Sequence, residues 1–303
     1  MSNVYLVWLE WPEKCFRVDA VALRFLEGLV RSKGGRVIRA RSEREFLRAL
    51  PQATHAIVWN FKDAWFAKSP RLKVLATPAA GQEFVPTKGS KGVKIHFGHY
   101  HGAIISESVV GFMLAWAKGF FRVRQAPKKC RAWPRTWLSD KCFDVAGTKA
   151  VIVGYGHVGR AIGAKLKALG VEVTGITRHG VFGQGSLPEA NWLILALPST
   201  TGTDNYLNEF LIRKLPRTCV VINVGRGNAI DERALYKALK TKRLAGAYLD
   251  VRKHEPSATV LETPGYVPEL ADLPNCIVMP HSASFSENYI RMAFEELKHD
   301  RCL

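Results

Sequence analysis

The stretch from Ala150 to Gly170 reads AVIVGYGHVGRAIGAKLKALG, and it decides the class of fold. The apolar residues at its start predict a buried strand. Gly154, Gly156 and Gly159 follow in a GxGxxG spacing, and a helical pattern then runs to the end of the stretch. Such glycines permit a tight turn and let a pyrophosphate approach the helix N-terminus. Because another strand pattern begins at residue 171, we expect a dinucleotide-binding unit rather than a glycine-rich turn without a ligand.

Apolar runs alternate with helical patterns on both sides of this stretch. The helical patterns include RAIGAKLKALG, ERALYKALKTKRL and ISESVVGFMLAWAKGFF, the last predicting a long helix that joins two sets of strands. Alternation of this kind predicts parallel sheets with helices on both faces, so we expect an α/β fold of two Rossmann-like, doubly wound domains. The first set of runs is VYLVWL, RVIRA, HAIVWN and LKVLAT, and the second is KAVIVG, VEVTGI, WLILALP, CVVINVG, LAGAYLD and NCIVMP.

Composition narrows the class of protein. The chain has 303 residues, 47% of them hydrophobic, which is enough for the cores of two domains. No apolar run reaches about 18 residues, so we expect no membrane span, and the start MSNVYLVWLEWPEKC does not resemble a signal peptide. The six cysteines are irregularly spaced without a CxxC pair, which predicts a reducing cytoplasm and no metal site.

The net charge of +18 is high. Much of it falls between residues 60 and 135, which contain 14 Lys and Arg residues but only three acidic residues. Such a field attracts nucleotides, phosphorylated or carboxylate metabolites, or nucleic acid. An equally favoured interpretation is that these basic residues form a solvated surface that keeps the protein soluble and binds no anion. Nucleic acid is the least favoured partner, because the sequence has no helix-turn-helix, zinc-finger or RNP motif.

Three residues with complementary chemistry follow three different strand patterns. Arg226 lies in INVGRGNAIDERAL, Glu255 follows AGAYLD, and His281 follows NCIVMP. The carboxyl ends of parallel strands line the ligand crevice of an open sheet. There an arginine can hold a carboxylate with two parallel hydrogen bonds, and a carboxylate beside a histidine favours the protonated, acid-donating ring. Each residue alone could be structural, but together they predict hydride chemistry on a carboxylate-bearing substrate.

Other histidines are weaker candidates. His96, His99 and His101 in IHFGHYH have a spacing that fits a turn as well as a metal site, and we expect a loop over the active cleft. His254 adjoins Glu255 and is an alternative acid/base, although the strand-end position favours His281.

These motifs resemble, over nearly the whole chain, those of the D-isomer-specific 2-hydroxyacid dehydrogenase family. The glycine motif and the LPSTTGT loop with Thr200 are similar to the family's cofactor site, and the LDV…EP segment is similar to the one that carries its catalytic glutamate, here Glu255. The resemblance implies a contact of Asp250 on the nicotinamide side, and it places a connecting-helix acid at Glu107. It implies a backbone grip on the substrate carboxylate at Ala80 and Gly81, in AAGQEF. The cofactor-binding residues implied are Gly154, Gly156, His157, Val158, Gly159, Pro198, Thr203, Val224 and Asp250.

The resemblance implies a mechanism, an assembly and a division of the chain. NAD(P)H would deliver hydride to C2 of a small 2-keto acid while Arg226 holds and polarises it, His281 donates the proton, and Glu255 supports the imidazolium. Relatives form homodimers through the nucleotide domain. The substrate-binding, flavodoxin-like domain would be 1–102 plus 282–303, and the dinucleotide-binding domain 103–281.

Several readings of the function stay open. A glyoxylate/hydroxypyruvate-type reductase is favoured; the alternatives are a 3-phosphoglycerate dehydrogenase and a dinucleotide-sensing regulator or corepressor. The family's TN..G loop reads HFGHYHG here, and HSASFSENY follows the histidine where glycine is frequent, so the substrate side chain stays open.

The stretch VEVTGITRHG, residues 171–180, predicts the cofactor preference. Val171, Val173 and Ile176 predict a short buried strand, and Thr177 stands where an NAD-selective site has an acid that repels a 2′-phosphate. Arg178 follows with donors suited to phosphate oxygens, helped by a protonated His179. We therefore expect NADP(H) to be preferred, with NAD(H) possible; in the alternative, Arg178 stacks on the adenine or points to solvent.

Overall fold

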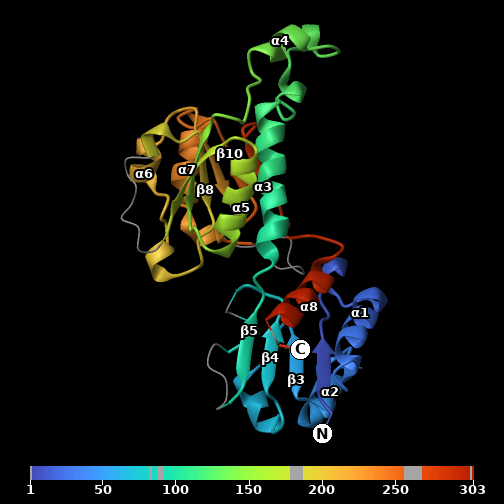
Figure 1. Ribbon diagram of the computed structural model, residues 1–303. Coiled ribbons are helices and arrows are strands. Elements are labelled where there is room, and N and C mark those ends of the chain that lie inside the picture. Colours follow the sequence, from blue (N-terminus) through green and yellow to red (C-terminus); the bar gives the residue numbers. More distant parts are fainter. Residues whose placement is uncertain (1, 82–83, 87–91, 178–186, 256–267, 301) are drawn as a thin grey trace. The chain divides into compact units, whose positions relative to one another are not determined.

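The computed structural model describes residues 2–81, 84–86, 92–177, 187–255, 268–300 and 302–303. The chain divides into two compact units, Met1–His101 with Phe285–Leu303, and Gly102–Ser284 (Figure 1). Each unit is built on one parallel sheet, which confirms the predicted α/β class with two doubly wound domains. Within the described ranges, no helix combines the length and apolar surface that crossing a bilayer requires.

The first unit has a five-stranded sheet in the order β2-β1-β3-β4-β5. All its pairings are parallel, and this 2-1-3-4-5 order is flavodoxin-like. Side-chain caps mark the start of its first two helices: Asp19 accepts from the Ala22 amide at 2.7 Å, and the Ser42 hydroxyl accepts from the Glu45 amide. The elements are β1 Val4–Trp8, α1 Ala20–Arg31, β2 Arg36–Arg39, α2 Glu43–Ala49, β3 His55–Val58, β4 Val74–Thr77, β5 Lys94–Phe97 and α8 Tyr289–His299.

The strand β5 corrects the expectation of a loop at IHFGHYH. His96 lies within β5 and is buried, whereas His101 is the first residue of a helix. Only residues 98–100 connect the two elements. The strand was hard to predict because β5 is a short edge strand, with alternating polar and apolar residues over only four positions.

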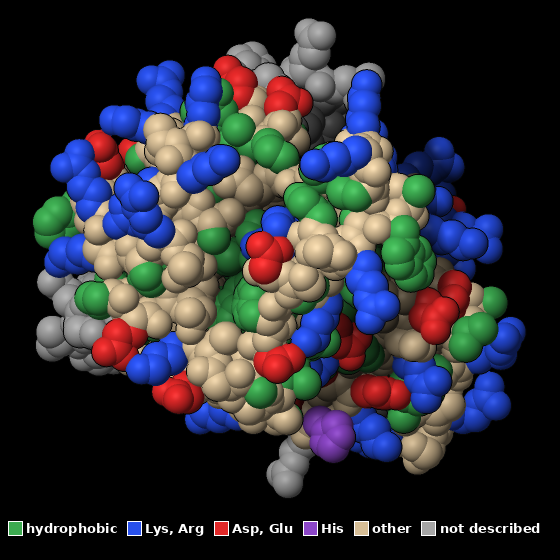
Figure 2. All heavy atoms as spheres, turned by 90° about the horizontal axis from the view of Figure 1, so that it is seen from above, with side chains coloured by type: hydrophobic (Ala, Val, Ile, Leu, Met, Phe, Trp, Pro, Cys, Tyr) green, Lys and Arg blue, Asp and Glu red, His purple; other side chains and the backbone are tan. Residues whose placement is uncertain are grey.

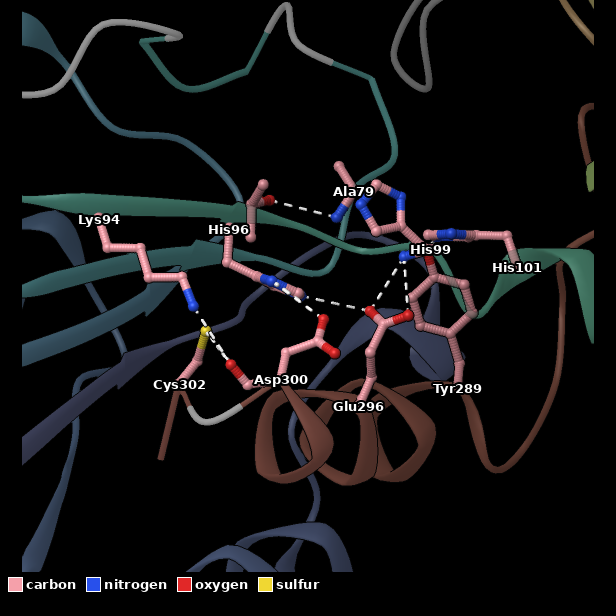
Figure 3. Close-up of polar contacts among 10 residues, drawn as sticks. Ala79, Lys94, His96, His99, His101, Tyr289, Glu296, Asp300 and Cys302 are labelled. Atoms are coloured by element: carbon pink, nitrogen blue, oxygen red, sulfur yellow. Dashed lines mark hydrogen bonds and ion pairs between the residues drawn. The ribbon is translucent and has the colours of Figure 1, made fainter. Parts of the chain in front are cut away.

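A group of polar residues, which we name the α8 clasp, holds the C-terminal helix to the end of β5 (Figure 3). It consists of His96, His99, Glu296 and Asp300. The His96 ring lies 3.3 Å from a Glu296 oxygen and 3.5 Å from an Asp300 oxygen. The His99 amide donates to both Glu296 oxygens, at 3.0 and 2.9 Å. The clasp explains why a histidine is tolerated inside this strand: its ring is paired.

The second unit has a six-stranded parallel sheet in the order β11-β10-β9-β8-β6-β7. The order reverses at β6, so the topological switch point lies between β6 and β8, where open sheets bind ligands. Its elements are β6 Lys149–Val153, α5 His157–Ala168, β7 Glu172–Ile176, β8 Trp192–Leu195, α6 Glu209–Lys214, β9 Val220–Asn223, α7 Glu232–Lys240, β10 Gly246–Leu249 and β11 Cys276–Val278; α3 His101–Ala117 precedes them, and α4 Arg135–Ser139 follows α3.

The burial of β7 differs from the expectation. Ile176 is buried, but Glu172, Thr174 and Gly175 are exposed, and Val173 is only half-buried. The physical reason is that β7 is the edge strand beside β6, so it lacks a neighbour on its other side. The apolar spacing indicated a strand but could not show its place in the sheet.

Candidate active site

The glycine turn between β6 and α5 is shaped by close backbone contacts. Gly154 has a φ of +93°, and a Cβ there would overlap the carbonyl of Ala196. Gly159 is packed in the same way on the Gly154 carbonyl. Around Gly156, in contrast, no atom of the described residues would lie within 4 Å of a Cβ, and none of their side chains caps the helix that follows it. The N–H groups at the start of α5 therefore suit a pyrophosphate.

The end of β7 is tied to this turn. The amides of Gly154 and Tyr155 both donate to the Ile176 carbonyl, at 3.0 and 3.1 Å. Thr177 is the next residue along the chain and is exposed. Arg178 and His179 lie outside the described residues.

The remaining residues expected to bind the cofactor fall into two groups. His157 at the start of α5 and Pro198 after β8 are exposed. Val224 is buried in the core after β9, and Val158 packs against the same core. Thr203 closes its own loop: its hydroxyl donates to the Pro198 carbonyl at 2.7 Å and accepts from the Thr200 amide at 2.9 Å. The LPSTTGT pattern thus specifies a rigid loop, and a ligand contact by Thr203 stays a prediction.

Asp250 shapes the turn that carries His281. The backbone of His281 is left-handed, with a φ of +54°, which is unusual for a residue with a side chain. Its amide donates to the Asp250 carbonyl at 2.8 Å, and the amides of Ser282 and Ala283 donate to an Asp250 carboxylate oxygen at 2.9 Å. Burial raises the pKa of Asp250. The structure therefore gives Asp250 a positioning function; a nicotinamide contact stays a prediction.

His281 and Glu255 form a hydrogen-bonded pair, with 2.8 Å between His281 Nδ1 and Glu255 Oε2. The hydrogen bond that His281 donates to Glu255 raises the pKa of His281, more than burial lowers it. Burial opposes ionisation of Glu255, but the bonds from His281 and from the Arg252 amide, with nearby positive charge, hold its pKa below the usual value. The pair therefore favours a protonated ring beside a charged carboxylate, an arrangement that can donate a proton near neutral pH.

Arg226 lies close to this pair. Its positive charge lowers the pKa of both Glu255 and His281. The side chain is half-buried, and its Nη1 donates to the Gly225 carbonyl at 3.0 Å. The structure thus brings together the three residues predicted from separate strand ends.

The two other predicted groups lie apart in the chain. Ala80 and Gly81 follow β4 in the first unit, Ala80 being exposed. Glu107 lies on α3 and pairs with Lys165 at 3.1 Å, with 75% of its side chain exposed. This pairing indicates a surface contact of Glu107 within the second unit.

Sequence reasoning missed three residues that support the site. Asn223 is fully buried at the end of β9, where its side chain accepts from the Gly225 amide and donates to the Arg226 carbonyl, both at 3.1 Å. Glu232 and Arg252 form a buried ion pair nearby. For Asn223, the available signal was an asparagine inside the apolar run CVVINV. For Glu232 and Arg252, no local pattern predicts the ion pair, because the two residues are 20 positions apart.

A glycine turn at the switch point of a parallel sheet, with an acid/base pair in the same unit, indicates a nicotinamide-dependent oxidoreductase as the class of protein. A family model described as "D-isomer specific 2-hydroxyacid dehydrogenase, NAD binding domain" matches residues 110–283. The chain belongs to the D-isomer-specific 2-hydroxyacid dehydrogenase family, whose members are oxidoreductases.

Named relatives agree with this assignment. The chain is 29% identical over 242 residues to a glycerate dehydrogenase of Methylorubrum extorquens, covering 75% of this chain and 74% of the relative. It is 30% identical over 246 residues to a glyoxylate reductase of Korarchaeum cryptofilum, covering 75% and 72%. A solved D-isomer-specific 2-hydroxyacid dehydrogenase of Lactobacillus delbrueckii ssp. bulgaricus, complexed with NAD, shares the fold with a TM-score of 0.78 at 18% identity, covering 99% and 96%.

Proposed function

We propose that the protein uses NADPH to reduce a small 2-keto acid of the glyoxylate or hydroxypyruvate type. The observation that carries the proposal is the hydrogen bond between His281 and Glu255, with Arg226 close by. The names of the two relatives, a glycerate dehydrogenase and a glyoxylate reductase, support a small substrate.

In the proposed mechanism Arg226 binds the substrate carboxylate and polarises the carbonyl, because its planar fork suits two parallel hydrogen bonds. Glu255 engages Nδ1 of His281, so Nε2 is the ring atom that donates a proton to the carbonyl oxygen. Glu255 stays ionised and stabilises the imidazolium before transfer. Gly156 and the N–H groups at the start of α5 would hold the pyrophosphate of a nicotinamide cofactor, which would supply the hydride for C2. Ala80 and Gly81 would bind the carboxylate through backbone amides.

The preference for NADPH rests on Thr177 and Arg178. Thr177 carries no charge to repel a 2′-phosphate, and the turn it adjoins is anchored to Ile176. A hydrogen bond from arginine to a charged group is worth about 1.5–3 kcal/mol, so Arg178 should favour NADPH by roughly 10- to 150-fold.

The test compares oxidation of NADPH and NADH with glyoxylate, hydroxypyruvate, pyruvate, phosphohydroxypyruvate and bulkier keto acids. We expect the highest kcat/KM for NADPH with glyoxylate or hydroxypyruvate, and a reduced preference in Arg178→Ala. Best activity with phosphohydroxypyruvate would instead indicate a 3-phosphoglycerate dehydrogenase. No turnover with any keto acid, together with tight dinucleotide binding, would indicate a sensor or corepressor.

We further propose a homodimer formed through the second unit, acting in the cytoplasm. In the segment after α3, Trp133 is 79% exposed and Phe120 68% exposed, which a partner surface would cover. All six cysteines, which fall in the described part of the chain, are free thiols, as a reducing compartment favours. Light scattering of the wild type and of Trp133→Ser tests the dimer; a monomeric wild type would exclude it.

A further inference from the structure

Glu232 and Arg252 form an ion pair in the interior of the second unit. Arg252 Nε donates to Glu232 Oε1 at 2.8 Å, and Nη2 donates to Oε2 at 2.9 Å, so both carboxylate oxygens are engaged by the planar fork. The side chains are only 4% and 9% exposed. Glu232 is the first residue of α7, where the helix dipole favours a carboxylate.

Stability alone gives little reason for this pair. Removing two charges from water is costly, and well-packed apolar residues of similar volume often replace a buried ion pair without loss of stability. A polar pair does, however, fix one geometry, because both hydrogen bonds form only in one relative position.

The ion pair fixes the backbone between Arg252 and Lys253. The Lys253 amide donates to Glu232 Oε1 at 2.9 Å, while the Arg252 amide donates to Glu255 Oε1 at 3.2 Å. The carboxylate of Glu255 is therefore held on one oxygen by this backbone and on the other by His281.

The same backbone also packs closely against the turn that carries Arg226, and so restricts its conformation. Gly227 follows Arg226 and is packed so closely on the 252–253 peptide that a Cβ would overlap both the Arg252 carbonyl and the Lys253 nitrogen. Two consecutive peptide units make these contacts: the 252–253 peptide contacts Glu232 and the turn of Arg226, and the 251–252 peptide, through the Arg252 N–H, contacts Glu255.

We propose that the Glu232–Arg252 ion pair is a positioning device for the active site. It fixes the backbone on both sides of Arg252, and thereby the orientation of Glu255 toward His281 and the course of the Arg226 turn. This inference rests on the proposed roles of Arg226, Glu255 and His281. Neither Glu232 nor Arg252 touches substrate in this scheme; both act through the backbone that they hold.

The test uses Arg252→Met and Arg252→Lys in the full chain, with the keto acid that the wild type reduces fastest. A misplaced catalytic group can cost about 100-fold in rate, so we expect kcat of Arg252→Met to fall by roughly 10- to 100-fold. The basic limb of the pH profile should move to lower pH, because a poorly aligned Glu255 supports protonated His281 less. Simple loss of a cation predicts the opposite shift, since a nearby positive charge lowers the pKa of histidine. Arg252→Lys keeps the positive charge but lacks the planar guanidinium group. Its kcat and the position of its basic limb should therefore lie between those of the wild type and of Arg252→Met.

Two controls separate positioning from stability and charge. Leu235→Ala, in the buried face of α7, should lower Tm but leave the pH profile unchanged. Arg213→Met, which breaks an exposed pair with Glu209, should leave both unchanged.

The double variant Glu232→Leu/Arg252→Met covers the case in which Arg252→Met fails to fold, because it leaves no unpaired buried charge. A folded double variant with reduced kcat and a shifted profile supports the inference; a wild-type kcat and profile overturns it. An inactive wild type would refute the proposed function instead, so the two failures are distinguishable.

Discussion

At the scale of single residues, the backbone of His281 shows how the site is maintained. A left-handed conformation costs an ordinary residue roughly 1–2 kcal/mol. Three amides in succession, from His281 to Ala283, donate to Asp250 and offset that cost. These hydrogen bonds therefore hold the His281 backbone in a left-handed conformation that residues with side chains rarely adopt, and they thereby orient its ring.

We predict that His281→Ala lowers kcat at neutral pH by roughly 10²- to 10⁴-fold, the usual contribution of a positioned acid. The matched control is His254→Ala, which removes an exposed histidine one residue from Glu255 and should leave kcat nearly unchanged. Steady-state kinetics of both variants check this. The reverse outcome would transfer the acid role to His254.

Glu255→Gln should change the pH dependence of keto-acid reduction. Glu255 raises the pKa of His281, so the proton donor stays protonated to higher pH in the wild type. Activity is lost as pH rises through that pKa. Because the amide removes the charge, the basic limb of the kcat/KM profile should move to lower pH. A limb at the wild-type position would show that Glu255 does not tune His281.

At the scale of elements, the glycine turn can be tested without measuring catalysis. Gly154→Ala places a Cβ in a left-handed residue and against the Ala196 carbonyl, so it should destabilise by at least about 1–2 kcal/mol and weaken binding of the dinucleotide. Thermal unfolding with and without NADPH measures both effects.

Gly28→Ala in α1 is the control for this substitution, since a Cβ there meets no atom of the described part of the chain within 4 Å. Alanine in a helix interior should stabilise by roughly 0.5–1 kcal/mol. If Gly154→Ala unfolds like Gly28→Ala and still binds NADPH, the packing argument for the turn is wrong.

Local patterns predicted most elements, and tertiary effects explain the exceptions. The strand, glycine turn and helix from 149 to 168 are all local signals, and the sequence predicted them. It missed β5 because His96 is paired by residues 200 positions away. It predicted Glu255 and His281 from strand ends, but the ion pair that supports them depends on α7 meeting the loop after β10, which no local spacing records.

At the scale of the whole molecule, basic charge dominates the surface. Figure 2 shows Lys and Arg side chains all around one face, with fewer Asp and Glu among them. We predict that kcat/KM for a substrate with several negative charges falls more steeply with added salt than for a monoanion, because the Debye length shrinks from about 10 Å at 0.1 M to about 3 Å at 1 M. The measurement compares phosphohydroxypyruvate with glyoxylate. Equal salt dependence of kcat/KM for the two substrates would show that the basic charge does not serve to attract the substrate.

The α8 clasp has a consequence for biosynthesis. Unit 1 is discontinuous, and α8, whose residues Tyr289, Phe294 and Leu297 are buried, is translated only after all of unit 2. On the ribosome, unit 2 can fold as one continuous segment, while the earlier sheet still exposes the apolar surface that α8 covers. The N-terminal part of the chain is thus the last to reach its native state, and that waiting period is when chaperones would be needed.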